Sequence, residues 1–243
     1  MQTQYDVCIV GAGITGLSTA LALLSQGYRV QILDASTLGS GSSGHNAGQL
    51  LPNYPVSDST LIERVGQSRA RGLLTLSQET LKNMTHHIQT NEISCDLQPV
   101  QYFLVSPHQP SPTRLQNTYT FNTTQYLQAL ANQVKDQGGV LCENTGWLHL
   151  PTLLKESSRA RYFVLATNTS DLSEIGVPDK IRTIETYLLI TDVLKTPLLS
   201  TPQQTAFSVP GACAHYLRYT HRGQLWVGFN CAPHHSLEQS ISQ

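Results

Sequence analysis

The chain has 243 residues, of which 40% are hydrophobic and 13% are charged, and its net charge is −1 at pH 7. This length suffices for one large domain or two small ones, and the apolar content suffices for a sizeable core. The near-neutral charge, without a basic patch, argues against a nucleic acid or an anionic membrane as partner. The sequence has no run of about eighteen apolar residues, so we expect no transmembrane span.

The N-terminus and the cysteines indicate the compartment. Only four residues precede the first predicted strand, which leaves no room for a signal peptide. The five cysteines are scattered and form no Cys-x-x-Cys motif, so we expect free thiols in a cytoplasmic protein. The neighbouring His86 and His87 point in different directions on a predicted helix and cannot chelate one metal together, and we expect no metal site.

The first fifty residues carry the clearest pattern. An apolar strand is predicted at residues 5–10, a helix from residue 14 to residue 24 and a second strand at residues 28–33. The turn Gly11-Ala12-Gly13-Ile14-Thr15-Gly16 joins the first strand to the helix, and Asp34 follows the second strand. This order, with about twenty residues between the turn and the acid, is typical of a dinucleotide site.

Each residue type in this pattern has a physical role. Gly11 permits the tight turn, Gly13 lets a pyrophosphate approach the backbone, and Gly16 lets the helix pack close to the strand. The helix N-terminus offers unpaired N–H groups and a positive dipole end to the phosphates. Asp34 can accept hydrogen bonds from ribose hydroxyls. The motif alone leaves both NAD and FAD open.

The segment after the acid narrows the choice of cofactor. Residues 38–49 are too rich in Gly and Ser for a helix or a central strand, so they form a loop with many N–H groups and hydroxyls. Here the sequence resembles the D-amino-acid oxidase/sarcosine oxidase-like family of FAD-dependent oxidoreductases, whose members carry a Ser-Gly-x-Asn-x-Gly run after the ribose acid. Within that family, residues 10–16 and 43–49 are most similar to amine oxidases related to gamma-glutamylputrescine oxidase.

The resemblance implies FAD as the cofactor, bound by three stretches. These are the glycine turn with its acid, the loop that follows, and Ala166-Thr167-Asn168, which resembles the motif that closes the FAD domain of the family. The implied cofactor residues are Gly11, Gly13, Ile14, Thr15, Gly16, Asp34, Ala35, Ser42, Ser43, Gly44, His45, Asn46, Ala47, Gly48, Gln49, Ala166, Thr167 and Asn168.

His45 has two readings within this resemblance. Some related enzymes carry a histidine near this position that bonds covalently to the flavin. The alternative is an ordinary loop histidine beside the cofactor. Both readings stay open at this point.

The rest of the chain completes an α/β fold. Ser57 or Asp58 can cap one long helix, or two joined near Gly72; Asn122 or Thr123 caps another, which Gly138-Gly139 closes before a strand at residues 140–145. Residues 215–229 read as a hairpin with Gly223 in its turn. We predict a Rossmann-like FAD-binding domain with a parallel sheet at residues 1–95 and 117–180. Residues 96–116 and 181–243 form a smaller, β-rich and incomplete substrate domain.

Four residues of the predicted hairpin are candidate substrate contacts: His215, Tyr216, Arg218 and Tyr219. An arginine can clamp a carboxylate with two parallel hydrogen bonds. The alternative is that they are ordinary strand residues. The sequence identifies no side-chain acid or base for catalysis.

The function implied by the resemblance is oxidation of a C–N bond in a small amine or amino acid by hydride transfer to FAD. The chain is shorter than members of the family and ends soon after the hairpin, so the family's C-terminal part has no counterpart. The alternatives are an FAD-binding but catalytically incomplete relative, or one subunit of a two-chain oxidase. A second subunit, or a further copy of the chain in a homo-oligomer, stays open as partner. An NAD-dependent dehydrogenase is a third reading, which residues 43–48 and 166–168 argue against.

Overall fold

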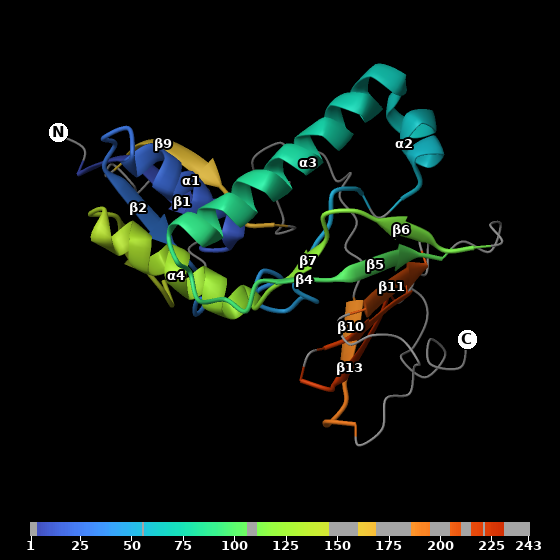
Figure 1. The fold of residues 1–243 in the computed structure, drawn as a ribbon. Helices are drawn as coiled ribbons and strands as arrows, with labels where there is room; N and C mark the ends of the chain where they lie inside the picture. Colours follow the sequence, from blue (N-terminus) through green and yellow to red (C-terminus); the bar gives the residue numbers. More distant parts are fainter. Residues whose placement is uncertain are drawn as a thin grey trace. The chain divides into compact units, whose positions relative to one another are not determined.

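The computed structural model describes residues 4–54, 56–105, 111–145, 160–168, 186–194, 205–209, 215–220 and 222–230. Its contacts divide the chain into two compact units (Figure 1). The first unit comprises Met1–Asn46 and Asn122–Thr183, and the second comprises Ala47–Phe121 and Ile184–Gln243. Each unit is built around its own sheet.

The first unit contains a four-stranded parallel sheet with the order β8-β2-β1-β9. Its strands are β1 (Tyr5–Val10), β2 (Val30–Leu33), β8 (Val140–Cys142) and β9 (Ala160–Leu165). In the two central strands, Ile9 lies opposite Ile32, and neither side chain has any exposed surface. Near-continuous apolar runs of this kind are typical of inner strands in a parallel sheet. The predicted Rossmann-like arrangement is confirmed.

Two helices accompany this sheet, α1 (Ile14–Leu24) and α4 (Thr123–Asp136), and they contact each other. The buried face of α4 includes Leu127, Leu130 and Val134. The helix begins at the predicted cap, where the Asn122 side chain accepts a hydrogen bond from the Gln125 N–H at 3.1 Å. Gly138, with φ +85°, follows its end.

The second unit contains a mixed six-stranded sheet with the order β10-β13-β12-β11-β5-β6 and a small sheet with the order β3-β7-β4. The strands are β3 (Gln49–Leu50), β4 (Gln98–Pro99), β5 (Gln101–Leu104), β6 (Thr113–Leu115), β7 (Tyr119–Thr120), β10 (Thr186–Ile190), β11 (Thr205–Val209), β12 (His215–Tyr219) and β13 (Leu225–Asn230). Strands β12 and β13 form the predicted hairpin. Gly223 lies in its turn with φ +75°, and its N–H donates to the Thr220 carbonyl at 3.0 Å.

The long helical region of the second unit is two helices, α2 (Asp58–Val65) and α3 (Gln67–Thr90). The Ser57 hydroxyl caps α2 by accepting the Thr60 N–H at 3.2 Å. The break lies at Gly66, not at the predicted Gly72, because Gly66 has φ +82°, a left-handed conformation that an α-helix cannot contain. Figure 1 shows the change of direction between the two helices.

Residues 47–95 group with the second unit, whereas the sequence-based division places them in the FAD-binding domain. The reason is strand pairing and packing: β3 pairs with β7, and Leu51 packs against a buried cluster of Val100, Tyr102 and Ala206. Contacts alone do not define a domain's function, so the predicted functional division stays a prediction.

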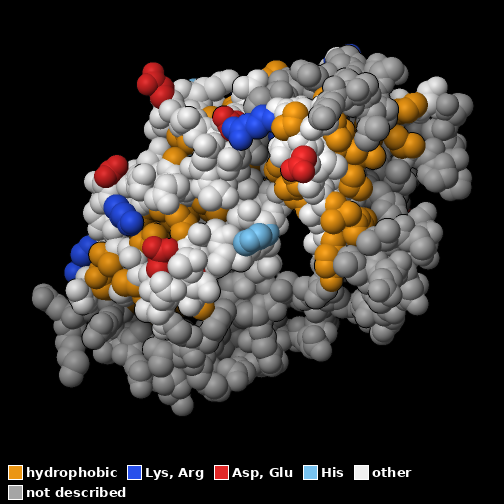
Figure 2. Space-filling model, turned by 90° about the horizontal axis from the view of Figure 1, so that it is seen from below, with side chains coloured by type: hydrophobic (Ala, Val, Ile, Leu, Met, Phe, Trp, Pro, Cys, Tyr) orange, Lys and Arg blue, Asp and Glu red, His pale blue; other side chains and the backbone are white. Residues whose placement is uncertain are grey.

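Charged residues make up 13% of the sequence. On the face shown in Figure 2, the described Lys, Arg, Asp and Glu side chains are few and interspersed. Of the helices in the described ranges, none is both long enough and apolar enough to cross a bilayer.

The cap of α4 provides a test of this architecture. Replacing Asn122 by Ala leaves the Gln125 N–H without its side-chain acceptor, and we expect the free energy of unfolding to fall by about 1 kcal/mol. The matched control is Asn132→Ala, which changes an exposed residue of the same helix and should stay within about 0.5 kcal/mol of the unsubstituted protein. Urea denaturation measures both, and equal stabilities of the two variants would contradict the assignment of the cap.

Candidate cofactor site

A cavity of about 290 Å³ lies in the first unit, where the carboxyl ends of β1, β2 and β9 meet the start of α1. The edge at which parallel strands end is the usual ligand site of such sheets. The lining residues are Val10, Gly11, Ala12, Gly13, Leu33, Asp34, Ala35, Ser36, Thr37, Gly39, Ser40, Gly41, Ser42, Ser43, Thr145, Ala166, Thr167 and Asn168. The cavity is therefore walled mainly by backbone, hydroxyls and one carboxylate.

The first and third glycines of the turn are required by close backbone contacts. Gly11 has φ +106°, and a Cβ there would collide with the carbonyl oxygen of Ala166. A Cβ on Gly16 would collide with the carbonyl oxygen of Gly11. The tight turn and the close approach of α1, both predicted from the motif, are present.

Gly13 has a different role, because its φ of −73° is available to any residue. A Cβ at Gly13 would lie 2.9 Å from the Ser43 hydroxyl oxygen. That oxygen accepts a hydrogen bond from the Ile14 N–H at 3.2 Å. The first turn of α1 and the glycine-serine loop thus meet at the cavity, with hydrogen-bonding groups where an anion would approach a helix N-terminus.

Asp34 closes the glycine turn from the neighbouring strand. Its Oδ2 accepts the Ala12 N–H at 2.7 Å, and its Oδ1 accepts the Ser36 N–H at 2.9 Å. Its backbone carbonyl accepts the Thr145 N–H at 2.9 Å and the Thr145 hydroxyl at 2.7 Å. Each carboxylate oxygen has a second lone pair, so the same side chain can hold the turn and accept a ribose hydroxyl.

The loop after Asp34 is folded on itself by side-chain hydrogen bonds. The Asn46 amide donates to the carbonyls of Ser42 at 3.1 Å and Ser43 at 2.8 Å. The His45 Nδ1 lies 3.1 Å from the Gly41 carbonyl oxygen. The Asn168 amide donates to the Ser42 hydroxyl at 3.4 Å and so ties the segment after β9 to this loop.

The predicted cofactor residues divide into three groups. Those in the cavity wall are Gly11, Gly13, Asp34, Ala35, Ser42, Ser43, Ala166, Thr167 and Asn168. Those in the first unit but outside the wall are Ile14, Thr15, Gly16, Gly44, His45 and Asn46, of which Ile14 reaches it through Ser43. Ala47, Gly48 and Gln49 belong to the second unit. Covalent attachment of a flavin at the exposed His45 stays a prediction.

Several lining residues are absent from the predicted set, among them Thr145, Thr37 and Ser40. Thr145 follows the strand β8, which is parallel to β2 and ends at the same edge of the sheet. This shared edge is the signal that could have identified Thr145. No sequence pattern identifies Thr37 and Ser40, because they line the cavity only as a result of how the loop after Asp34 folds back.

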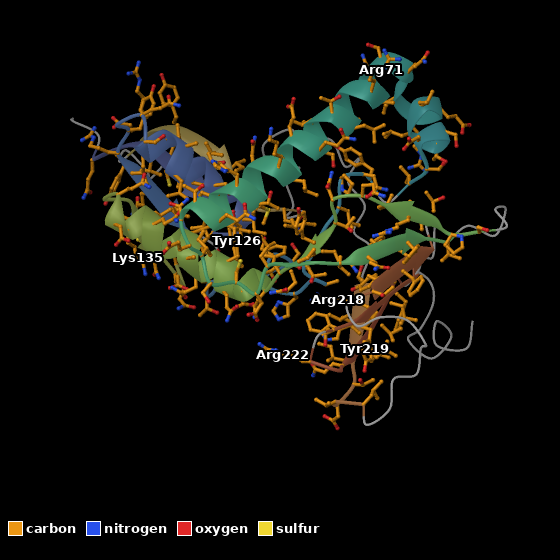
Figure 3. All side chains as sticks on the ribbon, viewed as in Figure 1. Arg71, Tyr126, Lys135, Arg218, Tyr219 and Arg222 are labelled. Atoms are coloured by element: carbon orange, nitrogen blue, oxygen red, sulfur yellow. The ribbon has the colours of Figure 1, made fainter. Side chains whose placement is uncertain are left out.

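The four candidate substrate contacts do not share one face of the second sheet. Side chains alternate along a strand, so Tyr216 and Arg218 lie on one face of β12 and Tyr219 lies on the other. Arg218 and Tyr219 are labelled in Figure 3. His215 alternates with Tyr216, but its side chain lies outside the described residues. Strand geometry thus separates Tyr219 from Tyr216 and Arg218, and a substrate role for any of the four stays a prediction.

Arg218 is buried, with only 8% of its surface exposed. Its Nη1 donates to the Ala47 carbonyl at 2.7 Å, and its Cζ lies 5.0 Å from the centre of the Trp226 ring. Burial lowers the pKa of the guanidinium to about 10, which still leaves it charged at neutral pH. Nearby on the same face, burial raises the pKa of the Tyr216 hydroxyl, with a further contribution from Tyr102.

The parallel sheet, the glycine turn and the acid after the second strand together define a dinucleotide-binding fold. Residues 6–120 match the family described as DAO, FAD dependent oxidoreductase. This match covers slightly less than half of the chain and agrees with the resemblance to this family of FAD-dependent oxidoreductases that the sequence motifs predicted.

Individual relatives agree with this resemblance to FAD-dependent oxidoreductases. Gamma-glutamylputrescine oxidoreductase of Escherichia coli (strain K12) is 38% identical over 99 residues, which cover 41% of this chain and 23% of that protein. The fold is shared with L-proline dehydrogenase from P. horikoshii, at a TM-score of 0.68 and 14% identity, covering 100% of this chain and 76% of that one. It is also shared with glycine oxidase from Geobacillus kaustophilus, at 0.62 and 16%, covering 99% and 76%. The match to the curated relative thus spans less than a quarter of its length.

The double role of Asp34 can be tested without any cofactor. We expect Asp34→Ala to lower the free energy of unfolding of the cofactor-free protein by about 2 kcal/mol, because two backbone N–H groups lose a charged acceptor. Asp34→Asn keeps one acceptor oxygen, so we expect a smaller decrease in the free energy of unfolding. Chemical denaturation monitored by circular dichroism measures the difference. A stability of Asp34→Ala equal to that of the unsubstituted protein would show that the carboxylate does not hold the turn.

Proposed function

We propose that this chain binds FAD at the first-unit cavity and oxidises the C–N bond of a small amine or amino acid. The observation that carries the proposal is the meeting of the α1 N-terminus, the Ser43 hydroxyl and the Asp34 carboxylate around one cavity. The match of residues 6–120 to the DAO family of FAD-dependent oxidoreductases supports FAD over NAD.

The residues present fit the nucleotide part of FAD. A pyrophosphate needs hydrogen-bond donors without an obstructing side chain. The Ser43 hydroxyl can donate to it while its oxygen accepts the Ile14 N–H, and Gly13 leaves the approach open. Asp34 would accept a ribose hydroxyl, and the chain beyond β8, which includes Thr145, would lie toward the adenine. A cavity of about 290 Å³ lies at the lower end of the range for small-molecule sites, which suits this part of the cofactor.

When bound, the flavin would supply the acceptor for the electrons removed from the substrate. The protein's own contribution would be to hold the cofactor by the groups described above and to present the substrate. For the latter role we propose Tyr216, which lies on the same face of β12 as the anchored Arg218. Tyr219 lies on the opposite face.

The substrate class is inferred from the names of relatives. A gamma-glutamylputrescine oxidoreductase, a glycine oxidase and an L-proline dehydrogenase each have a substrate that contains an amine. We extend this class, and not any one of these substrates, to the present chain. The alternative is a protein that binds FAD without oxidising an amine. The absorbance experiment below distinguishes this alternative from an active oxidase.

The cysteines are consistent with a cytoplasmic location, which we also propose. Cys8, Cys95 and Cys142 are free, and the first two are buried. Burial raises the pKa of the Cys8 thiol to about 11, so it is neutral and poorly nucleophilic. Free thiols of this kind are usual in a reducing compartment.

The visible absorbance spectrum of the purified protein tests the cofactor. We expect flavin bands that are released into the supernatant by acid, or that appear after addition of FAD. Bands that stay with the precipitate would indicate covalent attachment and favour His45. Bleaching of the bands by added amines under anaerobic conditions would support turnover, and bands without bleaching would favour the non-catalytic alternative. A colourless protein that FAD cannot restore would overturn the proposal.

Gly13→Val tests the location of the site. The new side chain would displace the Ser43 hydroxyl and occupy the approach to the helix N-terminus, so we expect FAD affinity to fall by about tenfold or more, or at least 1.4 kcal/mol. The matched control is Gly72→Ala, since a Cβ at this glycine in α3 meets nothing within 4 Å. FAD titration gives the affinities and circular dichroism confirms folding. Unchanged affinity in folded Gly13→Val would place FAD elsewhere.

A further inference from the structure

We infer that Arg218 is a positioning residue, which fixes the segment Ala47–Gln49 at the point where the chain enters the second unit. This differs from the substrate-carboxylate contact predicted from the sequence. The inference rests on the proposed function, because the family resemblance makes Ala47, Gly48 and Gln49 cofactor-adjacent.

The environment of Arg218 is that of an anchored side chain. Its Nη1 donates to a backbone carbonyl at 2.7 Å, and its planar group lies over the indole of Trp226, its direct neighbour across the strands. Among the residues that the structure describes, no carboxylate pairs with it. A buried charge needs compensation, and here a carbonyl oxygen and an aromatic face provide it.

The segment that Arg218 holds is anchored at each of its residues. The Ala47 carbonyl accepts from Arg218, and the Gly48 carbonyl accepts the Phe121 N–H at 2.9 Å. Gln49 pairs with Thr120 in the small sheet. The Ala47 anchor is nearest in sequence to the cofactor loop, and it is made by a side chain.

The backbone at Gly48 explains why this segment needs a firm anchor. Gly48 has φ +59°, and a Cβ there would collide with the Phe121 carbonyl oxygen and lie 3.6 Å from the Arg218 Nη1. The chain is thus bent into a left-handed conformation directly beside the guanidinium. Loss of the Arg218 bond would leave the carbonyl of the half-buried Ala47 without this donor and would remove one of the contacts that hold the bend.

The alternative is that Arg218 is kept for an anionic ligand. The Trp226 Nε1 and the Gln49 Nε2 are buried and have no partner among the described residues. Two N–H donors are therefore available for a ligand. A ligand carboxylate would use those donors, whereas a positioning role would not require them. The two roles therefore predict different results for the same variant.

Hydrogen exchange in the cofactor-free protein separates these roles. In Arg218→Met, we expect amides in peptides covering residues 47–52 and 119–123 to exchange about tenfold faster than in the unsubstituted protein, because the local opening free energy falls. The matched control is Arg222→Met, which removes an exposed arginine of the same hairpin that pairs with Asp96 at 3.1 Å and should leave these peptides unchanged. Trp226→Leu removes the stacking surface and should speed exchange in the same direction, which keeps the test available if Arg218→Met does not fold.

Two binding measurements complete the test. Under a positioning role, Arg218→Met weakens FAD binding by titration, while the affinity for acetate, a minimal carboxylate probe, is the same in variant and parent. Unchanged exchange together with loss of acetate binding would overturn the inference in favour of an anion site. If the unsubstituted protein binds no FAD, the proposed function fails; if it binds FAD and Arg218→Met matches it in exchange and affinity, only the present inference fails.

Discussion

The structure of the first unit depends on a contact between backbones that leaves no room for side chains. The carbonyl of Gly11 lies against Gly16, and the carbonyl of Ala166 lies against Gly11, so a Cβ at either glycine would overlap an oxygen. These contacts bring the start of α1, the end of β1 and the segment after β9 to one place. The cavity lies at this place, and its wall combines the glycine turn with hydroxyl side chains and the Asp34 carboxylate.

The polar groups of this wall serve folding and binding together. Asp34 accepts hydrogen bonds from two backbone N–H groups, and Ser43 accepts one from the first residue of α1. These bonds hold the turn and the loop in place before any ligand arrives. Because less ordering is then needed when a ligand binds, more of the interaction energy appears as affinity.

Local sequence patterns predicted the local structure well. The glycine turn, the Asn122 cap, Gly138 after α4 and Gly223 in the hairpin each act through their own backbone or nearest neighbours. The break between α2 and α3 was harder, because Gly66 and Gly72 are the same residue type in similar surroundings. Only the backbone angle of Gly66, which depends on how both helices pack, distinguishes them.

Contacts between residues far apart in the sequence could not be predicted from local patterns. The grouping of residues 47–95 depends on β3 and β7, which are two residues long and carry no recognisable pattern. The Arg218–Ala47 bond joins residues 171 positions apart, and no spacing rule predicts such a pair. Strand alternation, in contrast, was available from the sequence and would have separated Tyr216 and Arg218 from Tyr219. In the second unit, strand alternation thus separates the candidate substrate contacts into two faces, and the Arg218–Ala47 bond determines that Arg218 is held in place.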